Sequence, residues 1–187
     1  MKKFELTAES KINIFGKKLF RIKALISFGD VEEGETGGWI EKEENLEQSS
    51  GNAWVYGNAE VYGNARVSGN AWVSGNARVS GDAEVSGNAW VYGNVEVYGN
   101  ARVSGNAEVS GNADYTTIHG FGTQFRTTTF FQCEDKQIRV SCGCFLGTIP
   151  EFREQVKNTR EGKIAEEYLM IADLMEKHFV KEKESGE

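Results

Sequence analysis

The stretch Gly51–Ser68, GNAWVYGNAEVYGNARVS, repeats one six-residue phrase three times, and the residues after it continue the phrase. From Gly51 to Ser110 the chain holds ten consecutive copies of G-[ND]-[AV]-x-V-[SY], and an eleventh begins at Gly111 and loses the pattern at Tyr115. Within each copy Ala and Val stand two residues apart, so both point to one side of an extended segment. The Gly-Asn pair supplies a bend, because both residues tolerate left-handed backbone conformations. Each copy is therefore predicted to form one short strand and one corner.

The variable fourth letter of the phrase indicates how many strands form a coil. Tryptophan recurs there in every third copy, which predicts three strands and 18 residues per coil. This spacing also places opposite charges beside each other on the two remaining faces, a favourable arrangement between neighbouring strands. The three series are Trp54, Trp72, Trp90; Glu60, Arg78, Glu96; and Arg66, Glu84, Arg102. We therefore expect a mainly β protein in which three parallel sheets form a β-helix (51–115) around Val55, Val61, Val67 and their equivalents.

The residues before the array predict a β cap over 1–50. Apolar and polar residues alternate around Gly16-Lys17-Lys18, which indicates a β-hairpin. Residues 31–50 are interpreted as an irregular first coil, because Gly38-Trp39-Ile40-Glu41 imitates the Ala-Trp-Val-Tyr of the repeat. On this interpretation Trp39 lies below Trp54, and all four tryptophans of the chain form one outward ladder.

The residues after the array, 116–187, predict a small α+β subdomain. Arg126 to Phe145 is expected to form a hairpin that turns at 134–136. Thr148-Ile149-Pro150-Glu151 has the form of a helix capping box, followed by helix to about Asn158. A second helix is expected from about Gly162 to Phe179. Its apolar face, expected to pack on the hairpin or on a neighbouring subunit, comprises Ala165, Tyr168, Ala172, Met175 and Phe179.

Composition argues against several classes of protein. A net charge of −7 is unfavourable for a protein that binds DNA or RNA through phosphate contacts. No apolar run is long enough for a signal peptide or a membrane span, so we expect a soluble cytoplasmic protein without a membrane partner. Three cysteines in such a chain are expected to be reduced thiols rather than a disulfide framework.

The array resembles the hexapeptide-repeat left-handed parallel β-helix, whose coils place Val inward and a small residue two positions before it. The resemblance implies left-handed coiling, an exception to the right-handed crossover rule. The full layout, with FELT, GGWIE, Arg-Thr-Thr-Thr-Phe and Cys-Gly-Cys-Phe segments around the repeats, resembles hexapeptide-repeat proteins of phages and prophages. Phage proteins include factors that bind host immune signals or effectors, so this resemblance makes counter-defence an expected role. In that case the protein acts in the cytoplasm of the host cell.

Catalysis is not the expected function. Many hexapeptide β-helices are acyltransferases with a catalytic His on a loop between coils, but residues 51–113 contain no His and no inserted loop. The γ-type carbonic anhydrases of this fold need three His around a metal, and this chain has only His119 and His178. We therefore expect no catalytic residue, no metal and no cofactor, with acyltransfer as the remaining enzymatic alternative.

Three further groups of residues each have two interpretations. Cys142-Gly143-Cys144 could be a metal or redox pair, although buried or turn-associated thiols are favoured. His119 could act as a general base, although a turn histidine is favoured. Arg126 with the following threonines could hold phosphate, or could form a threonine-rich edge strand. The ligand-binding candidates are His119, Arg126, Thr127, Thr128, Thr129 and Arg139.

An outward aromatic face is the most informative surface feature. Soluble monomers rarely expose such a contiguous patch, so a subunit interface in a homotrimer is favoured over a platform that stacks planar ligands. The interface candidates are Trp54, Tyr56, Trp72, Trp90 and Tyr92. The expected function is a non-catalytic binding protein, such as a counter-defence factor that sequesters a nucleotide signal or blocks a host defence protein. The alternative is a structural or assembly protein in which the array is a rigid spacer.

Overall fold

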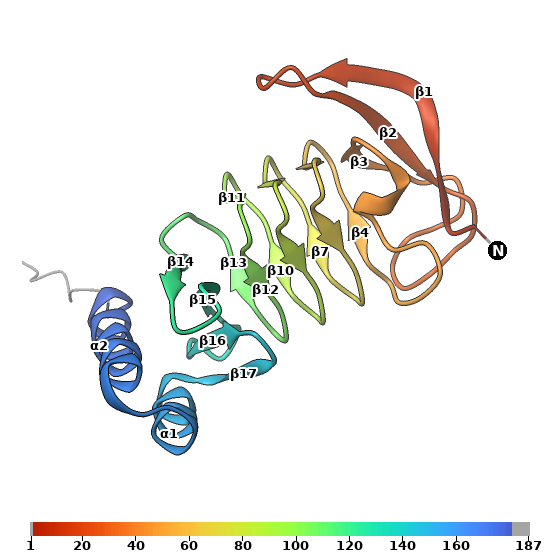
Figure 1. The fold of residues 1–187 in the computed structure, drawn as a ribbon. Coiled ribbons are helices and arrows are strands. Elements are labelled where there is room, and N and C mark those ends of the chain that lie inside the picture. The colour runs from red at the N-terminus through yellow and green to blue at the C-terminus, as the bar shows by residue number, and fades with distance from the viewer. Residues whose placement is uncertain (1, 181–187) are drawn as a thin grey trace, which may run out of the picture.

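A computed structural model describes residues 2–180 of the chain. The repeats form a β-solenoid, with a hairpin over its N-terminal end and a sheet with two helices at the other (Figure 1). The strands of the array are β4 (Trp54–Val55), β5 (Glu60–Val61), β6 (Arg66–Val67), β7 (Trp72–Val73), β8 (Arg78–Val79), β9 (Glu84–Val85), β10 (Trp90–Val91), β11 (Glu96–Val97), β12 (Arg102–Val103) and β13 (Glu108–Val109).

The predicted 18-residue coil is confirmed. Each strand pairs in parallel with the strand three further along the chain, so the solenoid has three faces, formed by β4-β7-β10-β13, β5-β8-β11 and β6-β9-β12. Trp72 lies between Trp54 and Trp90 in register, and Arg78 lies between Glu60 and Glu96. The valines point inward and are essentially inaccessible, with Val55 and Val61 at 0% exposure. The repeat phrase thus specifies both the register and the core.

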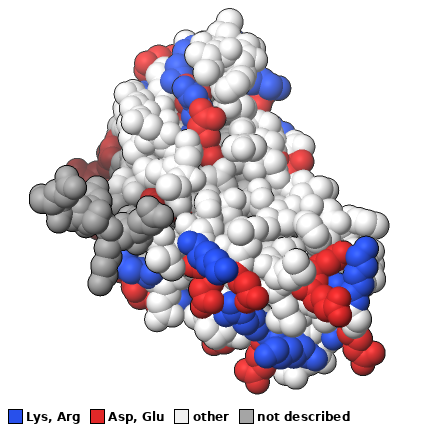
Figure 2. Space-filling view, turned by 90° about the vertical axis from the view of Figure 1, so that its left-hand side faces the viewer, with Lys and Arg blue, Asp and Glu red and all other residues white. Residues whose placement is uncertain are grey.

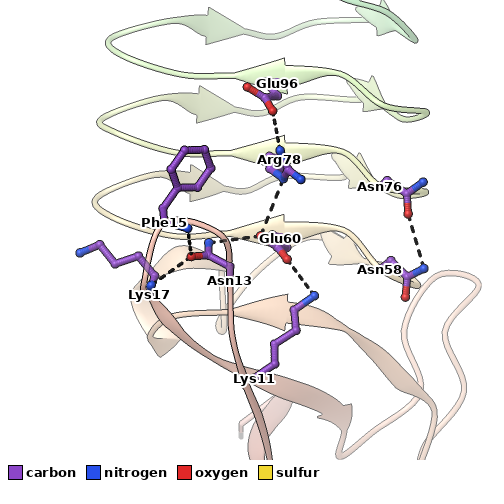
Figure 3. Close-up of polar contacts among 9 residues, drawn as sticks. All are labelled: Lys11, Asn13, Phe15, Lys17, Asn58, Glu60, Asn76, Arg78 and Glu96. Carbon is purple, nitrogen blue, oxygen red and sulfur yellow. Dashed lines mark hydrogen bonds and ion pairs between the residues drawn. The ribbon is translucent and has the colours of Figure 1, made fainter.

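The corners depend on glycine and asparagine. Gly69 has a φ of +67°, and a Cβ added to it would lie 3.0 Å from the backbone nitrogen of Gly87 in the next coil. Any side chain there would meet both backbone strain and a steric contact. The neighbouring asparagines bond along the solenoid, as Figure 3 shows for Asn58 and Asn76, whose Nδ2 and Oδ1 atoms lie 3.4 Å apart.

The first coil is shifted relative to the prediction. β3 (Thr36–Ile40) pairs with β5, so Trp39 lies beside Glu60, and Leu46 forms a bridge with Val67. These partners are 21 residues apart instead of 18, because three extra residues separate Leu46 from Val55. An irregular first coil is present, but the prediction that Trp39 lies below Trp54 in one ladder is wrong.

The N-terminal hairpin extends one face of the solenoid. β1 (Phe4–Ile12) and β2 (Lys18–Ala24) pair antiparallel, and β2 pairs with β3. A 3-10 turn, η1 (Glu43–Asn45), follows β3. Within the array, Glu60 of β5 forms an ion pair with Lys11 at 2.8 Å and accepts a hydrogen bond from Asn13 at 3.2 Å, and Arg78 lies between Glu60 and Glu96 (Figure 3). The predicted charge series therefore also anchors the hairpin.

The C-terminal subdomain is an antiparallel sheet covered by two helices. Its strands are β14 (Tyr115–Phe121), β15 (Arg126–Gln132), β16 (Ile138–Cys142) and β17 (Phe145–Thr148), followed by α1 (Ile149–Thr159) and α2 (Gly162–His178). Thr148 caps α1 through the predicted capping box with Glu151. Tyr168, Ala172 and Met175 of α2 pack with Phe130 and Phe152 in a second core, so the apolar face of α2 is used within the chain.

Candidate functional site

A groove of about 530 Å³ opens where the last coil meets the C-terminal sheet. None of the described residues that line it is Asp or Glu. The lining comprises Asn100, Arg102, His119, Phe125, Arg126, Thr127, Gly143 and Cys144. In a chain with a net charge of −7, a groove that gathers arginines without carboxylates is suited to an anion. We call it the cationic groove.

Arg102 is placed by the solenoid and held by the neighbouring sheet. It is the last residue of its charge series, so Glu84 lies beside it on one side, with Nε and Oε2 3.4 Å apart, and no further coil covers the other side. Its backbone N–H donates to Thr129 Oγ1 at 3.0 Å, and its Nη1 donates to the carbonyl of Gly143 at 3.4 Å. Its side chain is half exposed to solvent.

Arg126 enters the groove from β15. Gly143 occupies the turn between β16 and β17 with a φ of +64°, and a Cβ added there would lie 2.5 Å from Arg126 Nη1. The positive φ of the turn therefore favours glycine, and a larger residue there would also displace the guanidinium group of Arg126. His119 and Thr127 face each other across β14 and β15, with Nδ1 and Oγ1 3.2 Å apart.

The structure brings together only part of the predicted ligand set. His119, Arg126 and Thr127 line the cationic groove. Thr128 and Thr129 are buried, and both are hydrogen-bonded within the protein. Thr128 donates to the Sγ of Cys142 at 3.2 Å, and Thr129 accepts from the backbone N–H of Arg102. Neither of them lines the cationic groove, so neither is exposed to a ligand there.

Of the two arginines Arg139 and Arg102, only Arg102 lines the cationic groove. Arg139 lies outside it, paired with Asp135 at 2.7 Å in a cavity of about 760 Å³ that also contains Glu134 and Glu151. Arg102 was missed by sequence reasoning, which treated it only as a member of a charge series. Its position at the end of that series, next to the non-repetitive segment, was the signal that could have identified it.

The cysteines are turn and core thiols. Cys142 and Cys144 flank Gly143 in the hairpin turn, and Cys133 is buried. Burial raises the pKa of the Cys133 thiol to about 11, so it stays protonated near neutrality. Across residues 2–180 the structure contains no group of three or more His, Cys, Asp or Glu side chains placed to hold a metal ion. Neither α1 nor α2, the helices of this region, is long and apolar enough to cross a bilayer.

The aromatic face differs from the predicted ladder. Trp54 has 0% exposure, because Phe4 and Phe28 of the N-terminal cap pack against its ring. It is therefore not accessible as an interface residue. Its neighbour Trp72 is half-buried and contacts the ring of Tyr56, while Trp90 is 51% exposed.

Tyr92 lies beside this aromatic face and points to the next strand. Its hydroxyl donates to Glu108 Oε1 at 2.9 Å, and Lys136 Nζ lies 2.7 Å from Glu108 Oε2. The hydrogen bonds from Lys136 and Tyr92 lower the pKa of Glu108, and the hydrogen bond to Glu108 raises the pKa of Tyr92. Glu108 is therefore ionised, and Tyr92 is a neutral donor, near neutral pH.

Comparison with known proteins identifies a solenoid repeat. A family model described as the YdcK beta solenoid repeat matches residues 59–75 and 97–111, both within the array. A search of curated proteins found no match. The chain is thus similar, over two parts of its array, to the YdcK β-solenoid repeat, and its coil of 18 residues makes it a β-solenoid protein.

Proposed function

We propose that the protein is a non-catalytic binding protein whose ligand is a small phosphorylated molecule held in the cationic groove. The observation that carries the proposal is the convergence of Arg102, His119 and Arg126 on one cavity without a lining carboxylate. Guanidinium groups bind phosphate oxygens through paired, charge-assisted hydrogen bonds. Thr127 adds a hydroxyl, and Phe125, which is 66% exposed, adds an aromatic ring at the rim.

A nucleotide combines the two chemical features that this groove can recognise. Its phosphates fit the arginines, and its base offers a planar face to an aromatic ring such as Phe125. On the face drawn in Figure 2, Lys and Arg lie among Asp and Glu and form no continuous basic track of the kind that nucleic acid backbones bind. On this face, the charge pattern therefore favours a small anion over a polymer.

We place this binding in phage counter-defence, where the protein sequesters a nucleotide immune signal inside the host cell. The support for that setting is the likeness of the sequence to phage and prophage proteins. The support for an anionic ligand is the cationic groove. No step of bond formation or cleavage is needed, because a sequestering protein acts by affinity alone.

The test combines mass spectrometry with titration. Purified protein is gently denatured and the released small molecules are identified, and binding of ADP and adenosine is then measured by calorimetry. We expect ADP to bind and adenosine to bind at least about tenfold more weakly, because a charge-assisted contact contributes about 1.5–3 kcal/mol. Arg126→Gln and Arg102→Gln should weaken ADP binding, whereas Arg139→Gln, outside the groove, is the matched control. Equal affinities for ADP and adenosine would contradict the proposal.

A second candidate function is a structural assembly protein. It is favoured by the half-buried Trp72 ring and the exposed Trp90 ring, which resemble the apolar centre of a subunit interface. In this case the protein is a trimer that holds the array as a rigid spacer, and its assembly state is independent of ADP.

A further inference from the structure

The aromatic stack has one open end, at Trp90. Trp72 and Trp90 lie nearly parallel, with ring centroids 5.4 Å apart and planes inclined by 4°. Trp72 has ring neighbours on both sides, Tyr56 and Trp90. Within residues 2–180 the only ring partner of Trp90 is Trp72, so its second face has no aromatic neighbour. Because Trp90 is also 51% exposed, the stack offers one accessible ring face rather than a row of them.

The next strand replaces tryptophan with a carboxylate. Glu108 is the β13 partner of Trp90, at the position where the series would place another ring. A cavity of about 310 Å³ lies at this point, lined by Asn88, Trp90, Asn106, Ala107, Glu108 and Glu134. The change from Trp to Glu thus leaves a space beside the exposed indole, large enough for a small planar group.

The electrostatic character of this cavity is opposite to that of the cationic groove. Glu134 has no ion pair or side-chain hydrogen bond with any described residue, and Glu108 is paired only with the exposed Lys136 and with Tyr92. The face of an indole ring is the negative side of its quadrupole and attracts cations. Lys136 balances the charge of Glu108, whereas no described residue balances the charge of Glu134, so the ring and Glu134 favour the same kind of ligand, a cation.

We propose that this cavity binds a guanidinium group, which stacks on Trp90 and donates hydrogen bonds to Glu108 and Glu134. A guanidinium is planar, permanently charged and weakly hydrated, and it presents five donors in its own plane. It can therefore cover the free face of the indole while its edge points at the carboxylates. An ammonium group cannot stack in this way, and an uncharged ring can donate hydrogen bonds to the carboxylates but gains no ion pairing from them.

The guanidinium can come from a free arginine derivative or from an arginine within a peptide. The cavity shares Asn106 and Glu134 with the larger cavity of about 760 Å³, which also contains Glu151 and the exposed Leu146. An arginine-containing peptide could continue into that space, whereas a free arginine derivative could not. The inference is independent of the nucleotide proposal, because it uses a different cavity and ligands of opposite charge.

The experiment titrates the full chain with N-acetyl-arginine amide, N-acetyl-lysine amide, adenosine and the tripeptide Gly-Arg-Gly. Binding is followed by calorimetry and by the NMR signal of the Trp90 indole N–H. We expect the arginine derivative to bind more tightly than the lysine derivative, and adenosine to bind most weakly. Tighter binding of the tripeptide than of the amide supports a peptide as the source, and equal binding supports the free molecule.

Two substitutions measure separately what the ring and the carboxylate contribute to binding. Trp90→Leu and Glu134→Gln should each weaken binding of N-acetyl-arginine amide by about tenfold. Tyr98→Leu removes an exposed aromatic residue outside the cavity lining, and Glu84→Gln removes a carboxylate on another face, so both should bind as the parent does. Circular dichroism checks that each variant is folded. Absence of binding, equal loss in a variant and its control, or tighter binding of adenosine than of the arginine derivative would overturn the proposal.

Discussion

Trp90 covers one face of Trp72, with the two ring planes inclined by 4°. The rings are thus stacked along the solenoid, and their edges rather than their faces point outward. Edges of this kind can pack between subunits, but they give successive nucleobases no face to stack on. The sequence hypothesis of a stacking platform along the whole ladder therefore reduces to the single free face at Trp90.

Assembly through the aromatic face can be tested by introducing a charged residue into it. Trp72→Arg should remove an aromatic anchor and place like charges near the axis of the expected trimer, a loss of about 2 kcal/mol or more per site. We expect a trimer for the parent and a shift toward monomer for the variant, measured by multi-angle light scattering at matched concentration. Ser86→Arg adds the same charge on another face and should remain trimeric. A monomeric parent would remove the support for the assembly function.

The core prediction uses one inward residue. Val79 is fully buried, so Val79→Asp places a carboxylate in the solenoid interior without a partner, at a cost of several kcal/mol. We expect insoluble or unfolded protein by circular dichroism and solubility assays. The matched control, Ser80→Asp, adds the same group one residue later on the outward side, and it should fold normally. A cooperative melting transition at the parent temperature in Val79→Asp would contradict the inward placement.

The anchor of the hairpin depends on Glu60. Its side chain is only 12% exposed, forms ion pairs with Lys11 and Arg78, and accepts a hydrogen bond from Asn13. Glu60→Gln removes its charge, so we expect a loss of stability of about 1–3 kcal/mol and faster hydrogen exchange in β1. The control is Glu84→Gln, whose carboxylate is 47% exposed and should contribute less than about 1 kcal/mol. Unchanged exchange in β1 would show that the strand pairing alone holds the hairpin.

Stability should vary with pH through Lys3. Burial lowers the pKa of Lys3 to about 8 in the folded protein, although its Nζ donates to the carbonyl of Ala53 at 3.1 Å. Between pH 8 and the ordinary lysine value of 10.5, the unfolded chain binds more protons than the folded one, so the Lys3 contribution to stability rises with pH.

The variant Lys3→Met lacks this titration. We compare the free energy of unfolding of Lys3→Met with that of the parent at each pH. The variant's value minus the parent's value should be about 2–3 kcal/mol larger below pH 8 than above pH 10.5. Urea unfolding of both proteins across this range measures the difference. A constant difference would show that Lys3 is not buried as described.

The repeat made most of the fold predictable, because each residue type has one role in every copy. Val forms the core, Gly and Asn form the corners, and the residue at the fourth position indicates the coil length. The preferences within one copy and the pairing between coils therefore specify the same fold. This agreement ends at the N-terminal side of the array. Trp39 looked like a repeat tryptophan, but the three extra residues before Val55 moved it to the face of Glu60, and periodicity cannot show how a loop absorbs an insertion.

The candidate site was predictable only in part. Arg126 and Thr127 were identified by residue type, yet Thr128 and Thr129 of β15 are buried, with Thr128 bonded to Cys142 and Thr129 to the backbone of Arg102. Arg139 has the right chemistry but pairs with Asp135. Trp54 was expected to be exposed because the repeat places its equivalents on the outer surface. The packing of Phe4 and Phe28 against its ring buries it instead. Such contacts between distant segments leave no period in a sequence.

The uniform coil has a consequence for the distance between the two ends of the molecule. Duplicating residues 69–86 would add one whole coil, move the helices away from the hairpin by about 4.8 Å, and leave the order of faces unchanged. Adding a single six-residue copy would instead carry the C-terminal subdomain onward by one face of the solenoid. The number of repeats therefore sets both how far the cationic groove lies from the hairpin and in which direction it opens.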